Sequence, residues 1–135
     1  MSMFDEPHFG KEGSNIVSIW ASKVPLKEIP TDYFSENYSD EDDGSFNQFS
    51  VDFGLGFYDH DFVENARDYG DTNEDKLSFA SYGQSFCKVA SDACDIPKVE
   101  DFYLMYDFIY DPDVTEINES KYYKFIGCFK YDKNT

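Results

Sequence analysis

The residues best suited to chemistry stand together in the segment Tyr58-Asp-His-Asp-Phe62. Carboxylates and an imidazole bind metal ions and transfer protons in acid–base catalysis. The segment alternates as a β-strand does, so Asp59 and Asp61 would share one face about 7 Å apart, while His60 would point to the other face. Two carboxylates alone make a poor metal centre. We therefore predict no metal ligand and no catalytic residue here: His60 and Phe62 are expected to be structural, and the acids to face a partner.

A second acidic segment, Ser39-Asp-Glu-Asp-Asp-Gly44, resembles a calcium-binding loop only superficially. With Gly44 at the sixth position of such a loop, Ser39 occupies the first and Ser50 the twelfth, where calcium loops carry carboxylates. Calcium binding of this type is excluded. The chain also has no G-x-S-x-G nucleophile motif and no phosphate-binding glycine loop. The sequence thus predicts neither an enzyme nor a cofactor.

The three cysteines, Cys87, Cys94 and Cys128, are an odd number without C-x-x-C spacing. If Cys87 and Cys94 share a helix, two turns place their Cα atoms about 10 Å apart, which is too far for a disulfide. Reduced thiols, mostly in the core, are typical of a cytoplasmic protein. The first thirteen residues lack the regions of a signal peptide, and no apolar run has the length of a membrane span.

Charge is the strongest signal in the composition. Twenty-eight Asp and Glu against eleven Lys and Arg give a net charge of −17, which argues against nucleic acid and anionic membranes as partners. Fourteen of the acids lie between Asp32 and Asp75, where Arg67 is the only base. This imbalance predicts one negative face that attracts a basic protein and speeds its encounter. A generally solvated acidic surface is the alternative interpretation.

Aromatic residues are also in excess, with 14 Phe, 11 Tyr and 1 Trp. The single tryptophan, Trp20, is expected to be structural. The set is larger than a small core needs, so we expect some tyrosines on the surface, where they give contact area at low entropy cost. Tyrosines that simply reach water from the rim of the core are the alternative.

The elements that must position these residues are short. β-Branched and aromatic residues predict strands at 15–20, 57–62, 102–110 and 122–131. Gly127 in the last strand indicates either a bulge or a close approach of another backbone. Capping signals predict a short helix after Thr31 and helices at 46–53 and 82–94, the last two opened by capping boxes at Ser45 and Ser81. Residues 67–75 and 111–120 are expected to be loops.

Together these elements predict one α+β domain over residues 14–135, behind a mobile arm at residues 1–13. The sheet is expected to be antiparallel or mixed, with four to five strands and two to three helices packed on one face. A hairpin-length loop separates the strands at 102–110 and 122–131, which favours their direct antiparallel pairing.

Several segments, taken in order, resemble a family of bacterial immunity proteins from polymorphic-toxin systems, immunity protein family twenty-two. The likeness runs from about Asn15 to Asp132, and the Tyr-Asp-His-Asp-Phe segment is its most specific element. The segments are Ile16–Trp20, Tyr33–Tyr38, Phe49–Phe53, Tyr58–Phe62, Ser81–Phe86, Leu104–Asp107 and Phe125–Tyr131. The resemblance implies a cytoplasmic antidote that binds and blocks a secreted or contact-delivered toxin encoded beside it.

The leading hypothesis is therefore an immunity protein that neutralises a basic toxin of the nuclease class, as a monomer or weak dimer. Its acids would pair with Lys and Arg of the toxin, and exposed tyrosines would anchor the contact. The residues predicted to bind the toxin are Asp40, Glu41, Asp42, Asp43, Tyr58, Asp59, Asp61 and Glu64. Two alternatives stay open: an unselective acidic mimic of nucleic acid, and a small metal-dependent hydrolase that uses Asp59, His60 and Asp61.

Overall fold

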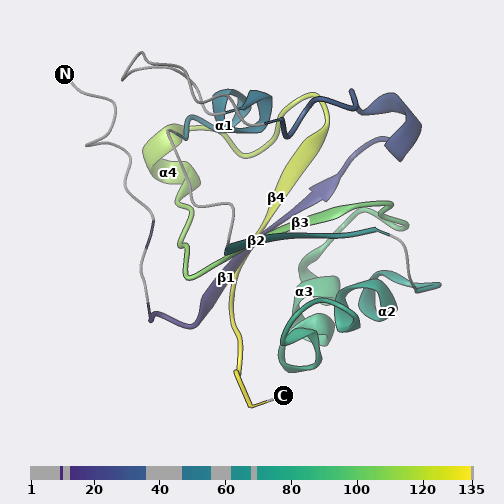
Figure 1. Cartoon of the computed structure of the whole chain (residues 1–135), viewed down its shortest axis with the longest axis vertical. Helices are drawn as coiled ribbons and strands as arrows, with labels where there is room; N and C mark the ends of the chain where they lie inside the picture. The colour runs from purple at the N-terminus through teal and green to yellow at the C-terminus, as the bar shows by residue number, and fades with distance from the viewer. Residues whose placement is uncertain (1–9, 11–12, 36–46, 56–61, 68–69, 135) are drawn as a thin grey trace.

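Four strands form one antiparallel sheet in the computed structural model, which describes residues 10, 13–35, 47–55, 62–67 and 70–134 (Figure 1). The spatial order is β2-β3-β1-β4, and every neighbouring pair is antiparallel. The bounds are β1 Ile16–Ser22, β2 Val63–Ala66, β3 Phe102–Tyr106 and β4 Tyr123–Lys130. The predicted α+β class with a four-stranded sheet is confirmed. Within the described ranges, no helix has the length and apolar character needed to cross a bilayer.

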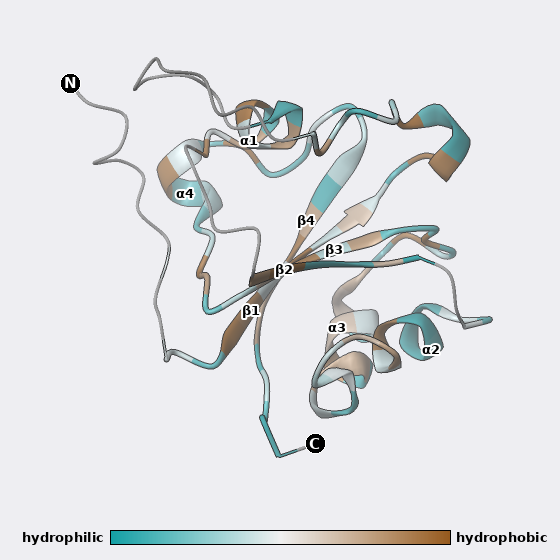
Figure 2. Ribbon diagram, viewed as in Figure 1, coloured by the Kyte–Doolittle hydropathy of each residue, from teal (hydrophilic) through white to brown (hydrophobic). Residues whose placement is uncertain are grey.

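Both faces of the sheet are buried, because its two central strands are apolar on both sides. All five residues of β3 are buried, and successive side chains enter opposite layers. Tyr103 and Met105 belong to one core, whereas Phe102 and Leu104 belong to the other. Hydrophobic residues accordingly follow the strands through the centre of the molecule (Figure 2). The sheet must therefore be covered on both faces, and a separate layer of helices and turns packs on each of them.

The first face is covered by α1, with the short η1 turn nearby, and its core is almost entirely aromatic. Trp20 of β1 is fully buried, as expected of a structural residue. Its ring contacts those of Phe49, Tyr110 and Phe125 at centroid distances of 5.1, 5.2 and 5.2 Å. Three short elements precede or follow the strands in this part of the molecule: η1 Leu26–Glu28, α1 Gln48–Asp52 and α4 Pro112–Thr115.

The second face is covered by α2 and α3, which lie together below the sheet in Figure 1. Leu77 of α2 and Ala90 of α3 are fully buried against it, beside Phe86. The elements are α2 Asn73–Ser78, η3 Gly83–Ser85 and α3 Cys87–Ala93. The expectation that helices pack on one face only is wrong, since α1 lies on the opposite side.

The predicted helix at residues 82–94 is interrupted at its start. Tyr82 adopts a left-handed conformation with φ 60°, so the chain makes the η3 turn and α3 begins only at Cys87. The predicted capping box at Ser81 does not form, because the Ser81 amide donates instead to the Glu64 carboxylate at 3.0 Å. Upstream, Thr72 caps α2 in a stretch that was expected to be a loop.

Other local expectations shift by a few residues. A capping box does open α1, but Asn47 and Ser50 form it, two residues after the predicted position. Residues 31–35 form turns and no helix. The predicted loop at 111–120 contains α4, which Asp111 caps. Of the predicted strand at 57–62 only Phe62 is described, and β2 begins immediately after it.

The strands that close the sheet do not form the predicted hairpin. β1 lies between β3 and β4, so both of them pair with β1 and not with each other. β3 ends at Tyr106 because Asp107 turns the chain out of the sheet with φ 53°. The predicted bulge is confirmed: the register of β1 against β4 shifts between Ile19 and Trp20, opposite Gly127, whose φ is +154°.

One buried carboxylate joins all four strands. Asp101, which directly precedes β3, is fully buried and accepts two hydrogen bonds from the Arg67 guanidinium, at 3.0 and 2.9 Å. It also accepts hydrogen bonds from Asn65 of β2 and from the Tyr123 hydroxyl of β4, while its backbone bonds Ser22 of β1. Its negative charge is thus compensated inside the protein.

We predict that Arg67→Met destabilises the fold by about 3–5 kcal/mol, because it leaves a carboxylate buried without its counter-ion. Asp101→Asn should cost less, about 1–3 kcal/mol, since the Arg67 side chain is 35% exposed and can reach water. Urea unfolding followed by circular dichroism measures both. Lys88→Met removes an exposed ion pair with Asp92 and serves as the control. A midpoint for Arg67→Met equal to that control would contradict the prediction.

Candidate partner-binding surface

Most residues predicted to bind a partner lie outside the described residues. They are Asp40, Glu41, Asp42, Asp43, Tyr58, Asp59 and Asp61, and the predicted structural residue His60 lies outside them as well. Glu64 is the member of the predicted set that the structure describes. The structure does describe two hollows that residues flanking these segments line: Ser35 and Asn47 line the first, and Phe62 lines the second.

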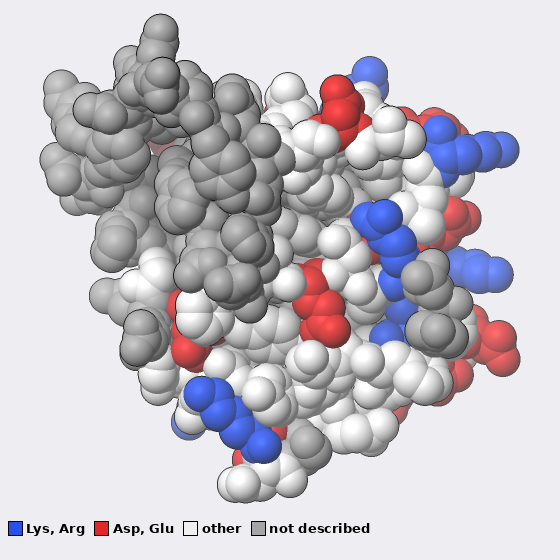
Figure 3. Space-filling view, in the orientation of Figure 1, with Lys and Arg blue, Asp and Glu red and all other residues white. Residues whose placement is uncertain are grey.

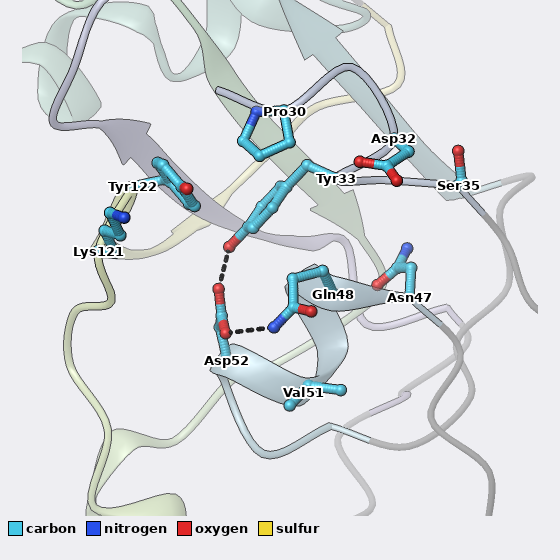
Figure 4. A pocket seen from close by; sticks show the side chains of 10 residues that line it. All are labelled: Pro30, Asp32, Tyr33, Ser35, Asn47, Gln48, Val51, Asp52, Lys121 and Tyr122. Carbon is cyan, nitrogen blue, oxygen red and sulfur yellow. Dashed lines mark hydrogen bonds between the residues drawn. The ribbon is translucent and has the colours of Figure 1, made fainter. Parts of the chain in front are cut away.

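The first of them, the α1 hollow, has a volume of about 580 Å³. Its walls come from the turn after β1, from α1 and from the residues before β4, as Figure 4 shows. Aromatic rings, carboxylates and amides make up most of the lining. The residues are Pro30, Asp32, Tyr33, Ser35, Asn47, Gln48, Val51, Asp52, Lys121 and Tyr122.

A chain of hydrogen bonds holds the centre of the α1 hollow. The Tyr33 hydroxyl donates to Asp52 Oδ2 at 2.6 Å, and Gln48 Nε2 donates to Asp52 Oδ1 at 2.9 Å. The Tyr33 ring is buried and stacks on Tyr123 at 5.6 Å. Burial, reinforced by the bond to Asp52, raises the pKa of Tyr33 well above its ordinary value. Tyr33 therefore remains a neutral donor, and Asp52 is held in place with its charge.

The acidic segment that carries Asp40–Asp43 begins and ends at this hollow. Ser35 is the last described residue before the segment and Asn47 the first after it, and both line the α1 hollow. Asn47 is fixed there by its capping bonds with Ser50. Asp32, which also lines the hollow, is exposed. Both ends of the segment are thus anchored beside described carboxylates.

Glu64 lies in a second hollow, the tyrosine hollow, of about 360 Å³. Glu64 Oε1 accepts hydrogen bonds from the Ser81 amide at 3.0 Å and from the Tyr106 hydroxyl at 2.8 Å, which fix the carboxylate. The lining residues are Phe62, Val63, Glu64, Ser81, Tyr82, Tyr106, Asp107, Tyr131 and Lys133. This hollow joins the ends of β2 and β3 to the turn before α3.

Phe62, which we predicted to be structural, immediately precedes β2. Its side chain is 42% exposed and lines the tyrosine hollow. Its structural role stays a prediction.

The predicted single negative face is not visible among the described residues on the side of the molecule that Figure 3 shows. Acidic and basic side chains are interspersed along the right-hand edge of Figure 3. Of the charges between Asp32 and Asp75, the acids Glu36, Asp40, Glu41, Asp42, Asp43, Asp59, Asp61 and Asp68 lie outside the described residues. The negative face therefore stays a prediction.

The described residues include few groups that are arranged for catalysis. Nowhere in the described ranges do three or more His, Cys, Asp or Glu side chains gather as a metal site requires. The three cysteines are free, with Cys87 buried, Cys94 half-buried and Cys128 exposed, so the expected core position does not hold for all of them. Desolvation raises the pKa of each thiol. This includes Cys128, whose sulfur lies 3.2 Å from Oγ of the buried Ser18 although the residue as a whole is exposed.

Fixed carboxylates and tyrosines in open hollows, on a rigid α+β sheet domain, have the composition of a protein-binding module. The comparison of sequences agrees with this class. The chain belongs to the Immunity protein 22 family, whose sequence model matches residues 17–132. No curated protein and no solved structure matches the chain.

Sequence patterns did not single out most of the residues that line the two hollows. Tyr33, Asp52 and Tyr122 come together from segments that are distant in the sequence, and so do Tyr82, Tyr106 and Tyr131. One signal was available: several tyrosines stand within a few residues of an acid, and in the folded chain tyrosine hydroxyls bond carboxylates.

We predict that stability falls steeply above about pH 10. Burial raises the pKa of Tyr33, Tyr106, Tyr123 and Tyr131, so these groups stay protonated in the folded chain while they ionise in the unfolded chain. Their contribution is complete below the ordinary tyrosine pKa of 10.0 and is lost as pH rises above it. In that range each such tyrosine lowers the free energy of unfolding by about 1.4 kcal/mol per pH unit.

Tyr33→Phe tests this dependence, because it keeps the ring and removes one titrating group. The slope of unfolding free energy against pH should then decrease by about 1.4 kcal/mol per unit above pH 10. Urea midpoints at a series of alkaline pH values give the slope. The same measurement at neutral pH gives the change in unfolding free energy that does not depend on pH. Parallel slopes for both proteins would disprove the assignment.

Proposed function

We propose that this protein is an antitoxin that binds the toxin encoded beside it and blocks its activity. Membership of the Immunity protein 22 family supports this role. The net charge of −17 supports a basic toxin, and toxins that act on nucleic acid are basic because their substrate is a polyanion. In this proposal the chain itself performs no catalysis.

The toxin-binding surface in this proposal is the α1 hollow together with the acidic segment that leaves it. The observation that carries the choice is that Ser35 and Asn47, the residues that flank this segment, both line the hollow. The two described acids of this hollow, the exposed Asp32 and Asp52, add to the negative charge of the proposed surface. A basic toxin is attracted by this charge, and Tyr122, which is half-buried at the rim, gives it an aromatic contact.

Electrostatic attraction in this arrangement acts first on the rate of encounter. Exposed charges accelerate association and fix the orientation of the partner, while only closely buried pairs add about 1.5–7 kcal/mol of coupling each. Removal of the acids of the segment should therefore change the association rate more than the dissociation rate. Salt should reduce that rate, because the Debye length is about 8 Å at physiological ionic strength.

We predict that Asp40→Asn, Glu41→Gln, Asp42→Asn and Asp43→Asn, combined in one variant, slow association with the toxin about tenfold or more at low salt. Stopped-flow association at several salt concentrations measures the rate and its salt dependence. The matched control removes four exposed acids outside the stretch from Asp32 to Asp75, with the same change in net charge. It combines Glu28→Gln, Asp92→Asn, Asp113→Asn and Glu116→Gln.

The two variants separate a local surface from general charge. Equal slowing by both would mean that net charge alone matters and would remove the proposed surface. An unrelated basic nuclease, tested beside the toxin, separates an antitoxin from an acidic mimic of nucleic acid: equal inhibition of the two would favour the mimic. A wild-type protein without affinity for the toxin would overturn the proposed function.

A further inference from the structure

The tyrosine hollow holds a carboxylate with unused capacity to accept hydrogen bonds. Glu64 Oε1 already accepts two short bonds, from the Ser81 amide and the Tyr106 hydroxyl. Glu64 Oε2, in contrast, has a single long contact of 3.4 Å, from the Ser81 hydroxyl. A carboxylate oxygen accepts two bonds readily. Glu64 can therefore receive a further donor from outside without losing the bonds that fix it.

The second acid of the hollow, Asp107, is occupied. Its oxygens accept the amides of Gly13 and Asn15, each at 3.0 Å, and the Tyr131 hydroxyl at 2.6 Å. Asp107 is also buried. It adds negative potential to the hollow but has little capacity for a new partner, so Glu64 is the group that an incoming ligand would meet.

The remaining walls are aromatic faces. Tyr82 stacks on Tyr131 with ring centroids 5.2 Å apart and planes 20° from parallel, and both rings meet Tyr106 nearly at right angles. A cation held beside such rings gains from their negative faces. A planar guanidinium suits this wall better than an ammonium, because it stacks on a ring while it donates in its plane to a carboxylate.

The backbone holds Tyr82 in this position against its own preference. Its φ of 60° is left-handed, a conformation that glycine or asparagine adopts readily and tyrosine does not. The next residue, Gly83, fixes the turn from behind, since a Cβ there would lie 2.1 Å from the Leu77 carbonyl oxygen. Strain of this kind gathers where a side chain is needed in one place.

We propose that the tyrosine hollow is a socket for one arginine side chain of the toxin, with Glu64 as its ion-pair partner and Tyr82 as its stacking surface. This inference rests on the proposed antitoxin function. The volume of about 360 Å³ lies at the small end of the range for ligand sites, which suits one long side chain and not a folded element. The exposed ring of Phe62 extends the apolar rim of the socket.

Lys133 is the one cation among the described residues that line the socket, and it gives the proposal a further test. It is exposed, and its positive charge opposes the entry of a cationic ligand into the same hollow. Removal of this lysine should strengthen binding, an effect that a merely structural hollow would not give.

The test is an NMR titration of the whole chain, labelled with ¹³C at tyrosine, with N-acetyl-arginine amide. N-acetyl-citrulline amide, which has the same shape without the charge, is the matched probe. Saturable shifts of the Tyr82, Tyr106 and Tyr131 ring signals are expected with arginine and not with citrulline. Equal responses to both probes, or shifts confined to other tyrosines, would overturn the socket.

Three variants locate the site. Glu64→Gln keeps an acceptor for Ser81 and Tyr106 and should weaken arginine binding about tenfold; Tyr82→Asn, which favours the left-handed turn, should retain the fold and weaken it similarly. Lys133→Gln should tighten binding about two- to threefold. Lys98→Gln, exposed in another hollow, should change nothing. Unchanged affinity in both Glu64→Gln and Tyr82→Asn would refute the assignment.

Binding of the arginine probe and neutralisation of the toxin can succeed or fail independently, so the socket and the antitoxin role are tested separately. If the chain neutralises its toxin and the probe does not bind, the socket fails and the antitoxin role stands. If the probe binds and the toxin does not, the antitoxin role fails and the socket stands. If both bind, Glu64→Gln should raise the dissociation constant of the toxin complex about tenfold, and an unaltered constant would show that no toxin arginine occupies the hollow.

Discussion

A single buried charge, the Asp101 carboxylate, constrains the whole sheet. Apolar strands that are buried on both faces have many acceptable registers, because any shift by two residues again buries hydrophobic side chains. Asp101 removes that freedom, since its burial is tolerable only when Arg67, Asn65 and Tyr123 all reach it. A slipped strand would leave a carboxylate in the core without donors. The ion pair therefore specifies the register of a sheet that hydrophobic burial alone would leave ambiguous.

Tyrosine hydroxyls are a recurrent partner of carboxylates in this chain. Arg67 is the only base between Asp32 and Asp75, and its guanidinium donates two hydrogen bonds to Asp101, which lies outside that stretch. Tyrosine hydroxyls take over part of the role that lysine and arginine play elsewhere: Tyr33 bonds Asp52, Tyr106 bonds Glu64 and Tyr131 bonds Asp107. A neutral donor stabilises a carboxylate without cancelling its charge, so the aromatic excess and the acidity of this chain have a common physical explanation.

The sequence predicted the features that depend on neighbouring residues, and it did not predict those that depend on contacts between distant segments. β1, β3 and β4 were located closely because their β-branched and aromatic runs are local signals, and Gly127 marked its bulge because few other residues adopt its conformation. The position of β1 between β3 and β4 could not be read, since it depends on contacts between distant segments. The interruption at Tyr82 was hidden for a related reason: the bond that takes Ser81 away from a capping role comes from Glu64, seventeen residues earlier. Of the predicted binding residues, Glu64 is placed in a hollow, and its tyrosine partners needed the fold to bring them together.

The two hollows lie on opposite sides of the sheet and can contribute differently to binding: one to attraction of a partner, the other to selectivity. The α1 hollow lies on the aromatic core that contains Tyr33, whereas Tyr106 and Tyr131 of the tyrosine hollow belong to the core on the opposite side of the sheet. Attraction by net charge needs no contact, so the acids of this chain can draw in a partner that is finally held elsewhere. Attraction alone, however, favours every basic protein equally. Selectivity requires short-range groups that leave a wrong partner with an unpaired charge or an empty socket, and the fixed Glu64 carboxylate beside the strained Tyr82 is a group of that kind. Recruitment and discrimination can then reside on different surfaces of one small domain, which lets each change without loss of the other.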